Sequence, residues 1–276
     1  MTAGHPGQVP GRPSSRADPH PTSFSDALDT PGDRRETLLL DVVFRKLQHF
    51  ADLSHEDRQA LESRARRVER YGSHVDVVQE GNDPRYLNLI LDGWACRYKQ
   101  LEDGRRQILS LFVPGDMCDP CVFLLDRMSH ALATLTPATF ARIPEKDVLE
   151  VMRGSAVLTR AFWLEMLVSA EVQREWTVSL GRRSATERLA HLFCELIARL
   201  RAVGLATASE CDMPITQADL GDALGLSSVH VNRTLQEMRA MKLIDLKGRR
   251  LVIHDEPALE SLALFDPNYL HLYRSS

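Results

Sequence analysis

The feature that most restricts the fold of this chain is a stretch from Ile215 to Met238, ITQADLGDALGLSSVHVNRTLQEM. It contains two short segments with apolar residues at helical spacing, separated by Leu224-Gly225-Leu226, where glycine permits a tight turn. Thr216 is placed to cap the first helix, with Asp219 three residues later as the return partner of a capping box, and Ser227 is placed to cap the second. The pattern predicts two helices joined by a sharp turn.

The second of these helices has a polar outer face where it begins. Val231, Leu235 and Met238 fall at i, i+4 and i+7 and form its inward face. The outward positions are Ser228, Val229, Asn232, Arg233 and Gln236. An ordinary antiparallel helix pair is the alternative, but its solvated face would usually be rich in Glu and Lys. The pattern therefore favours a helix-turn-helix, whose second helix presents its first residues to the DNA major groove.

A basic hairpin is predicted directly after the two helices. The segment KLIDLKGRRLVIHD reads as two short strands about a Lys247-Gly248 turn. This hairpin would form the wing of a winged helix-turn-helix, and Arg249 and Arg250 in it could contact phosphates.

Further upstream the hydrophobic period changes from that of helices to that of strands. Residues 36–70 read as helical, with Ser54 and Asp57 spaced as a capping box. Short alternating segments follow, separated by turn sequences such as Asp92-Gly93 and Asp103-Gly104. Strands at about ten-residue spacing with Asp-Gly turns predict an all-β roll or barrel.

A long helix is predicted next, within the helical pattern from Glu145 to about Leu180. Its central stretch, AVLTRAFWLEMLVSAEVQREWTVSL, contains neither glycine nor proline. One apolar face comprises Leu158, Phe162, Met166, Val172, Trp176 and Leu180, and a second comprises Val157, Ala161, Leu164 and Val168. One face would pack on the β-roll, and the same helix of a second chain would cover the other, which predicts a homodimer. A core helix in a monomer is the alternative.

Composition excludes several classes of protein. The net charge of −4 argues against wholesale coating of nucleic acid, although residues 182–254 carry eleven Lys and Arg against eight Asp and Glu. No apolar run approaches the ~20 residues that span a membrane. The five cysteines, without an apolar signal sequence, predict a cytoplasmic protein. Because Gly-rich phosphate loops and H-E-x-x-H or G-x-S-x-G motifs are absent from the sequence, no enzyme activity, cofactor or metal site is expected.

Taken in order, these motifs resemble the Crp/Fnr transcription regulators. The resemblance rests on the β-roll ending in PGD, the long helix, SATERLAHLFCEL, the helix-turn-helix and the KGRRLVI wing. It implies an α+β fold: a β-roll of the double-stranded β-helix type seen in cyclic-nucleotide-binding domains, a long dimerisation helix and a C-terminal winged helix-turn-helix. The expected divisions are a disordered tail (1–34), a sensor domain (35–152), a dimerisation helix (153–181), the DNA-binding domain (182–256) and a C-terminal extension (257–276).

The resemblance also assigns roles to residues of the helix-turn-helix. In the family the position of Arg233 reads a guanine, and bidentate Arg–guanine pairing gives the physical reason. Ser228 and Val229 stand at the other two base-reading positions, where the best-known members carry charged residues. The DNA sequence that those members recognise therefore cannot be assumed for this chain. The positions that hold the DNA backbone correspond to Thr216, Gln217, Ser227 and His230. The implied partners are an inverted repeat in double-stranded DNA, a second copy of the chain and RNA polymerase.

The sensor domain departs from members that bind cyclic AMP. Those members carry Gly-Glu just after GD and, further on, an Arg followed by a small residue, which bind the ribose and the phosphate. Here Asp119-Pro120 replaces Gly-Glu, Met128-Ser129-His130 replaces the Arg region, and Arg127 is out of register. Cyclic AMP is therefore not expected to be the effector. The candidate effector-binding residues are Cys118, Asp119, Arg127 and His130.

Cys118 and Cys121 form a C-x-x-C within the same segment. This spacing can lower a thiol pKa or bind metal, so a thiol redox sensor is an alternative function. A metal site would need further ligands, for which Cys96 and His130 are the candidates in this domain. Residues 1–95 contain no cysteine, so an Fnr-type iron–sulfur cluster is not expected. The other interpretation is two small buried residues. The effector, the target promoters and the choice between activation and repression stay open.

Overall fold

The computed structural model describes residues 34–272. The predicted disordered tail lies outside the described residues, apart from Arg34. The chain opens with α1 (Arg34–Leu47) and α2 (His55–Glu62), and Ser54 caps α2 in the capping box with Asp57. The helical prediction for residues 36–70 is wrong at its end, because β1 (Arg67–Tyr71) pairs with β8 (Ala138–Pro144). Pairing with a distant strand overrides the helix propensity of the Arg- and Glu-rich local sequence.

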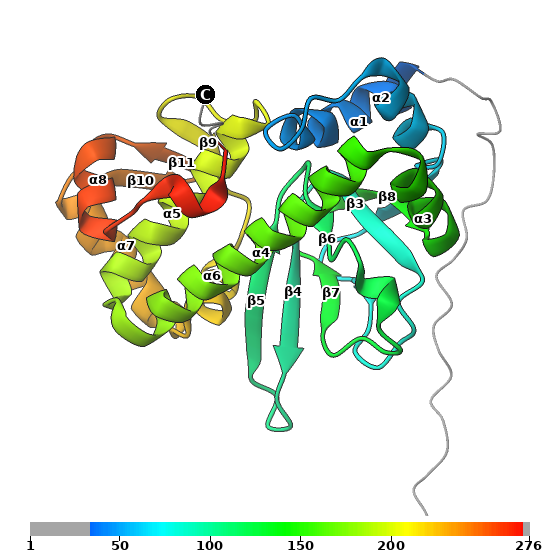
Figure 1. The fold of residues 1–276 in the computed structure, drawn as a ribbon. Coiled ribbons are helices and arrows are strands. Elements are labelled where there is room, and N and C mark those ends of the chain that lie inside the picture. The colour runs from blue at the N-terminus through cyan, green and yellow to red at the C-terminus, as the bar shows by residue number, and fades with distance from the viewer. Residues whose placement is uncertain (1–33, 273–276) are drawn as a thin grey trace, which may run out of the picture. The chain divides into compact units, whose positions relative to one another are not determined.

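Two four-stranded antiparallel sheets form the predicted β-roll (Figure 1). Their orders are β1-β8-β3-β6 and β2-β7-β4-β5. The remaining strands are β2 (Asp76–Val78), β3 (Tyr86–Asp92), β4 (Ala95–Gln100), β5 (Arg106–Phe112), β6 (Met117–Cys118) and β7 (Ala131–Thr134), with a short 3-10 helix, η1 (Val122–Leu124), between β6 and β7. Ile90, Phe112, Leu132 and Phe140 are buried together in a core to which strands of both sheets contribute.

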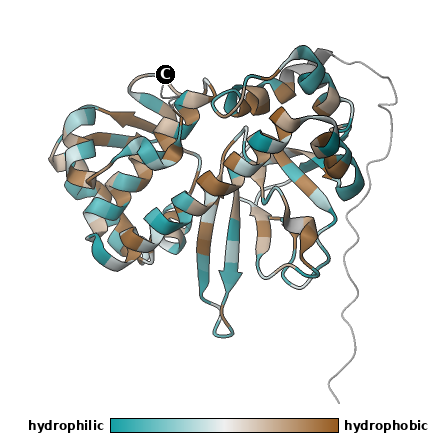
Figure 2. Ribbon diagram, viewed as in Figure 1, coloured by the Kyte–Doolittle hydropathy of each residue, from teal (hydrophilic) through white to brown (hydrophobic). Residues whose placement is uncertain are grey.

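The long helix follows α3 (Glu145–Gly154) and is α4 (Ala156–Arg182). Hydrophobic residues recur along its whole length (Figure 2). Phe162 and Trp176 of the first predicted face are buried within the chain, and so are Ala161 and Val168 of the second, whereas Met166 of the first face is exposed. The two predicted faces therefore do not separate a face packed within the chain from a free one. Gln173 on α4 donates a hydrogen bond to the carbonyl of Leu109 in β5, which ties the helix to the roll.

The predicted winged helix-turn-helix comprises three helices and a three-stranded sheet. The helices are α5 (Ala185–Ala202), α6 (Gln217–Leu224) and α7 (Ser228–Ala240), and the sheet has the order β10-β11-β9. Its strands are β9 (Glu210–Asp212), β10 (Ile244–Lys247) and β11 (Arg250–Ile253). β9 was not predicted from the sequence, and the hairpin turn lies at Gly248–Arg249, one residue later than expected.

The segment after the wing packs against the rest of the chain. It contains α8 (Glu256–Ala263) and a 3-10 helix, η2 (Pro267–Leu270). Leu259, Ala263, Leu270 and Leu272 are buried in the main hydrophobic core. Within residues 257–272, the predicted C-terminal extension is thus a packed part of the fold. Among the described residues, none of the helices combines the length and the apolar character needed to cross a membrane.

Candidate nucleic-acid interface and sensor pocket

Local hydrogen bonds shape the turn between α6 and α7. The backbone N–H of Asp219 donates to Thr216 Oγ1 at 3.1 Å, and Asp219 Oδ2 accepts from the Thr216 backbone N–H at 3.1 Å. Gly225 ends α6 with a φ of 65°, in the left-handed region that favours glycine. A Cβ at Gly221 would lie 2.5 Å from the carbonyl oxygen of Leu226, so glycine at this position lets the turn pass this close to α6.

The second helix, α7, has a buried and an exposed side. Ser227 caps it by accepting a hydrogen bond from the backbone N–H of His230 at 3.2 Å. Val231, Thr234, Leu235 and Met238 are buried. All the α7 side chains proposed from the sequence to face DNA are exposed: Ser228, Val229, His230, Asn232, Arg233 and Gln236. The structure therefore presents this set on one face of one helix.

Two contacts organise that face. Asn232 Nδ2 donates to Gln217 Oε1 at 3.2 Å, which joins α7 to the start of α6. The Arg233 guanidinium contacts the Glu237 carboxylate at 3.1 Å, one turn further along, and the Arg233 side chain is still 78% exposed. Thr216 and Gln217 are exposed beside this face, where phosphate contacts are expected.

The two wing arginines differ in their surroundings. Arg249 lies in the hairpin turn with a φ of 65° and is exposed. Arg250 pairs with Glu210 of the neighbouring β9, at 2.5 Å and 3.1 Å between nitrogen and oxygen. The sequence did not predict β9, so it did not predict Glu210 as the partner of Arg250. A DNA phosphate would have to compete with Glu210 for Arg250.

A contact from the β-roll reaches the helix-turn-helix. Arg106 at the start of β5 pairs with Asp219 at 2.6 Å and with Asp222 at 2.7 Å, both on α6. Gln107 also donates to the carbonyl of Ala223 at 3.2 Å. Arg106 thus offsets part of the negative charge of Asp219 and Asp222, the two acidic residues of α6. Sequence reasoning missed these pairs, because 113 positions separate Arg106 from Asp219 and no local pattern connects them.

Asp119 lies in the segment that differs from cyclic-AMP-binding members. Its backbone has a φ of 54°, and its partly buried carboxylate contacts both the Arg97 guanidinium and His130 Nε2, the latter at 3.1 Å. Burial acts to raise the pKa of Asp119, but the hydrogen bond from His130 and the charge of Arg97 hold that pKa below its ordinary value. Asp119 is thus an ionised carboxylate paired with groups of its own chain.

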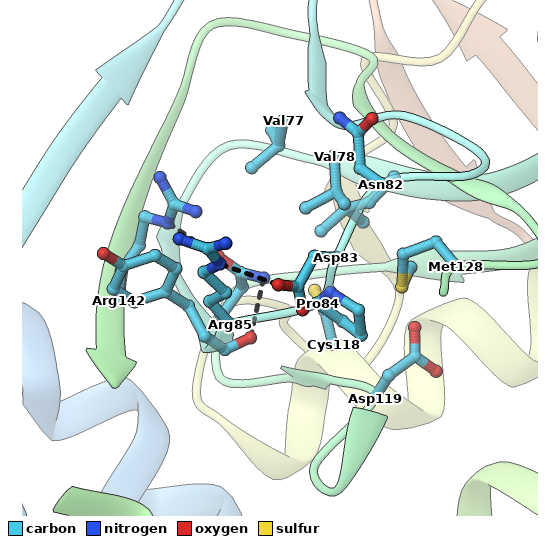
Figure 3. Close-up of a pocket in the computed structure, with 13 residues that line it drawn as sticks. Val77, Val78, Asn82, Asp83, Pro84, Arg85, Cys118, Asp119, Met128 and Arg142 are labelled. Carbon is cyan, nitrogen blue, oxygen red and sulfur yellow. Dashed lines mark hydrogen bonds and ion pairs between the residues drawn. The ribbon is translucent and has the colours of Figure 1, made fainter. Parts of the chain in front are cut away.

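A cavity of about 130 Å³ lies beside Asp119 (Figure 3). Cys118, Asp119 and the buried Asn88 contribute to its lining. Arg142, which sequence reasoning missed, also lines it and donates to Asn88 Oδ1 at 3.2 Å and to Glu69 at 2.9 Å. The cavity is smaller than the roughly 300–1,000 Å³ of typical small-molecule sites.

The four candidate effector residues are only partly brought together. Cys118 and Asp119 line the cavity, and His130 reaches it through Asp119. Arg127 is exposed and lies outside the set of residues that line the cavity. The arginines that line the cavity are Arg142 and Arg85, and each is already paired with a carboxylate of its own chain.

The two cysteines of the C-x-x-C motif are free thiols. Burial raises the pKa of Cys118 well above its ordinary value, and burial also raises the pKa of the half-buried Cys121. Since the thiolate is the reactive form, both groups are poorly suited to rapid oxidation. Across residues 34–272, no group of three or more His, Cys, Asp or Glu side chains is placed to hold a metal ion.

Comparison with known proteins identifies two families. Residues 187–262 match the Crp-like helix-turn-helix domain, and residues 68–155 match the cyclic nucleotide-binding domain. A nitrogen fixation regulation protein, FixK, of Azorhizobium caulinodans is 30% identical over 202 residues, which cover 72% of this chain and 77% of that protein. A probable transcriptional activator of Rhizobium leguminosarum bv. viciae is 28% identical over 189 residues, covering 68% and 77%.

The fold is also similar to that of a solved regulator. FixK2 from Bradyrhizobium japonicum superposes with a TM-score of 0.63, with 24% identity, over 71% of this chain and 96% of that one. At this identity the likeness supports the fold. It agrees with the order of β-roll, long helix and winged helix-turn-helix seen here.

Proposed function

Since this chain belongs to the Crp/Fnr family of transcription regulators, we propose that it binds an inverted repeat in double-stranded DNA as a homodimer. The observation that carries the proposal is the exposed face of α7. A capped helix presents hydroxyl, amide and guanidinium groups at its start, without an acidic side chain before Glu237. These groups match the hydrogen-bonding edges of bases in the major groove.

The phosphate contacts that we propose surround this face. The side chains at the starts of the two helices can contact phosphates of the DNA backbone. They are Thr216 and Gln217 on α6, and Ser227 and His230 on α7. Arg249 in the wing is exposed, so it is the cation best placed to bind a DNA phosphate. Arg250 is less available, because it already forms an ion pair with Glu210. Such contacts set the register of the protein on the duplex but do not select its sequence.

The homodimer is proposed to form through α4. Trp163, Met166 and Leu167 lie at i, i+3 and i+4 and are exposed, and Val157 and Val178 extend the same kind of surface toward the ends of the helix. Water-exposed tryptophan and leucine side chains grouped on one helix are typical of an interface between chains. Two-fold symmetry of the dimer would place one recognition helix in each half-site, about one helical turn apart.

We further propose that the sensor domain does not take cyclic AMP. The carboxylate of Asp119 would repel a cyclic phosphate, and the cationic groups nearby are paired within the chain. The alternative function, a thiol redox sensor acting through Cys118 and Cys121, receives less support because burial raises the pKa of both thiols.

The role in transcription also suggests a further partner and a location in the cell. Relatives described as activators suggest RNA polymerase as a partner, and a DNA target implies that the protein works in the cytoplasm. The proposed role requires neither a cofactor nor catalysis.

The decisive experiment is selection of bound duplexes from a random DNA pool, with and without reductant. The proposal predicts an inverted repeat that is the same in both conditions. Recovery of no consensus would contradict DNA reading, and a consensus seen only without reductant would instead support the redox sensor.

A further inference from the structure

Val229 is the most exposed large hydrophobic side chain in the described part of the chain, at 78%. Single exposed apolar residues are common on protein surfaces, so exposure alone carries little weight. Its position is what matters. It is the second residue of α7, on the turn that a helix-turn-helix inserts most deeply into the groove.

The neighbours of Val229 on α7 show which groups it would meet. Arg233 lies one turn further along on the same exposed face, four residues away, and Glu237 orients its guanidinium. Asn232 is engaged by Gln217. The leading turn therefore offers an apolar side chain beside a guanidinium, and no acidic group that could accept a hydrogen bond from cytosine.

The major groove offers one apolar group, the C5-methyl of thymine. We propose that Val229 is a specificity-determining residue that contacts a thymine methyl in each half-site. One helical turn advances about 5.4 Å and one base step about 3.4 Å, so this thymine should lie one or two base pairs from the guanine read by Arg233. The inference rests on the proposed DNA-binding function and adds to it the base preferred at a second position.

The test replaces thymine by 2′-deoxyuridine, one position at a time, in the selected duplex. Uracil lacks only the C5-methyl and keeps every hydrogen-bonding group. We expect one thymine per half-site whose replacement weakens binding about fourfold, which corresponds to one buried methyl group. Replacing it in both half-sites should weaken binding about fifteenfold. Fluorescence anisotropy at fixed salt measures these dissociation constants.

The variant Val229→Ala should reduce the uracil effect at that position, because it removes both γ-methyl groups and leaves only Cβ. Alanine is favourable on an exposed helix, so the variant should fold as the wild type does. Val75→Ala, the same change at an exposed position of the β-roll, is the matched control and should keep the uracil effect. Uracil tolerated at every position, or an equal effect in wild type and Val229→Ala, would overturn the inference.

The outcomes separate this inference from the proposed function. If selection yields no consensus at all, DNA reading itself fails. If selection yields a consensus whose guanine depends on Arg233, but uracil has no effect anywhere, then DNA reading stands and only the role of Val229 is wrong.

Discussion

Arg233 leaves the second turn of α7 with its guanidinium exposed and oriented by Glu237. Replacing Arg233 with Ala should weaken binding to the selected operator by about 1–3 kcal/mol and relax base preference at one position per half-site. The reason is that a bidentate pair with guanine discriminates among bases. Repeating the selection with the variant measures the change in preference, and an unaltered consensus would show that another residue reads the guanine.

Arg249→Ala is the control for that prediction, because it removes a cation of equal charge from the wing. It should weaken all sequences alike and reduce the slope of log affinity against log salt by about 1. Binding titrations at several salt concentrations, on operator and random DNA, measure both effects. A loss confined to the operator would mean that the wing reads bases.

Asp119 makes a second residue-scale prediction. Replacing it with Ala leaves the partly buried Arg97 without its carboxylate and should lower the free energy of unfolding by up to about 3 kcal/mol, the low end of the cost of breaking a fully buried ion pair. Millimolar acetate should recover part of this loss by occupying the vacated position. Urea unfolding with acetate or chloride as the anion measures the recovery. If acetate stabilises the wild type as much as the variant, or does not stabilise the variant, then the space left by Asp119 does not bind a carboxylate specifically.

Residue-scale features were predictable from the sequence where their partners are close in the chain. The capping boxes at Ser54–Asp57 and Thr216–Asp219 each join residues three positions apart, and both form as expected. The pairing of Arg97 with Asp119 and of Arg106 with Asp219 depends on strands and helices brought together by the fold. No spacing in the sequence encodes those contacts.

At the scale of elements, α4 illustrates why a hydrophobic pattern can be ambiguous. Apolar residues occur on every side of this helix, so spacing does not reveal which ones meet solvent. Phe162 is fully buried, whereas its neighbour Trp163 is 56% exposed. Our sequence analysis grouped Phe162 and Trp176 with the exposed Met166. Substituting either buried residue would test the core of the chain rather than a dimer interface.

The substitution that tests the dimer is Leu167→Glu. A charge on this exposed stripe should prevent two copies of α4 from packing, because burying it without a partner is costly. We expect a folded monomer that binds the operator weakly, since only one half-site is then held. Analytical ultracentrifugation measures the mass. Leu264→Glu, the same change at an exposed position after α8, should remain dimeric. A dimer retained by Leu167→Glu would place the interface elsewhere.

At the scale of the whole molecule, a buried ion network joins elements far apart in the chain. Asp116, after β5, contacts Lys46 of α1 at 2.5 Å and Arg199 of α5 at 2.6 Å. Lys46 also contacts Glu165 of α4, and Arg199 contacts Glu195 at 3.0 Å. The network therefore connects α1 and the turn between β5 and β6 with the long helix α4 and with α5, the first helix of the winged domain.

The network holds three carboxyl groups but only two cations, which gives the fold a pH dependence. Burial raises the pKa of Glu165 and that of Glu195. For Asp116, burial also acts to raise the pKa, but Arg199 and Lys46 outweigh it and lower the pKa of this carboxyl. Asp116 therefore contributes stability above its unfolded pKa of 3.8, and this contribution is lost only in stronger acid.

Glu165 acts in the opposite direction. Its raised pKa means that the folded state favours the protonated acid, so its contribution is complete below the unfolded value of 4.5 and is lost as pH rises through the folded pKa. One of its oxygens, Oε2, is buried without a hydrogen-bond partner among the described residues, which makes ionisation costlier. We expect the free energy of unfolding to fall as pH rises above 4.5. Glu165→Gln keeps the shape and removes the titration, so its fall over the same range should be smaller.

Urea unfolding of both proteins between pH 5 and about pH 8 tests this, within the range in which Asp116 stays ionised. The control is Glu102→Gln on the exposed turn between β4 and β5, which should unfold with the same pH profile as the wild type. Because Glu195 titrates in the same direction, some fall should persist in Glu165→Gln. Parallel profiles for Glu165→Gln and wild type would show that Glu165 is already ionised in the folded protein at pH 5. The excess negative charge would then be stabilised by Lys46 and Arg199 together rather than relieved by a proton.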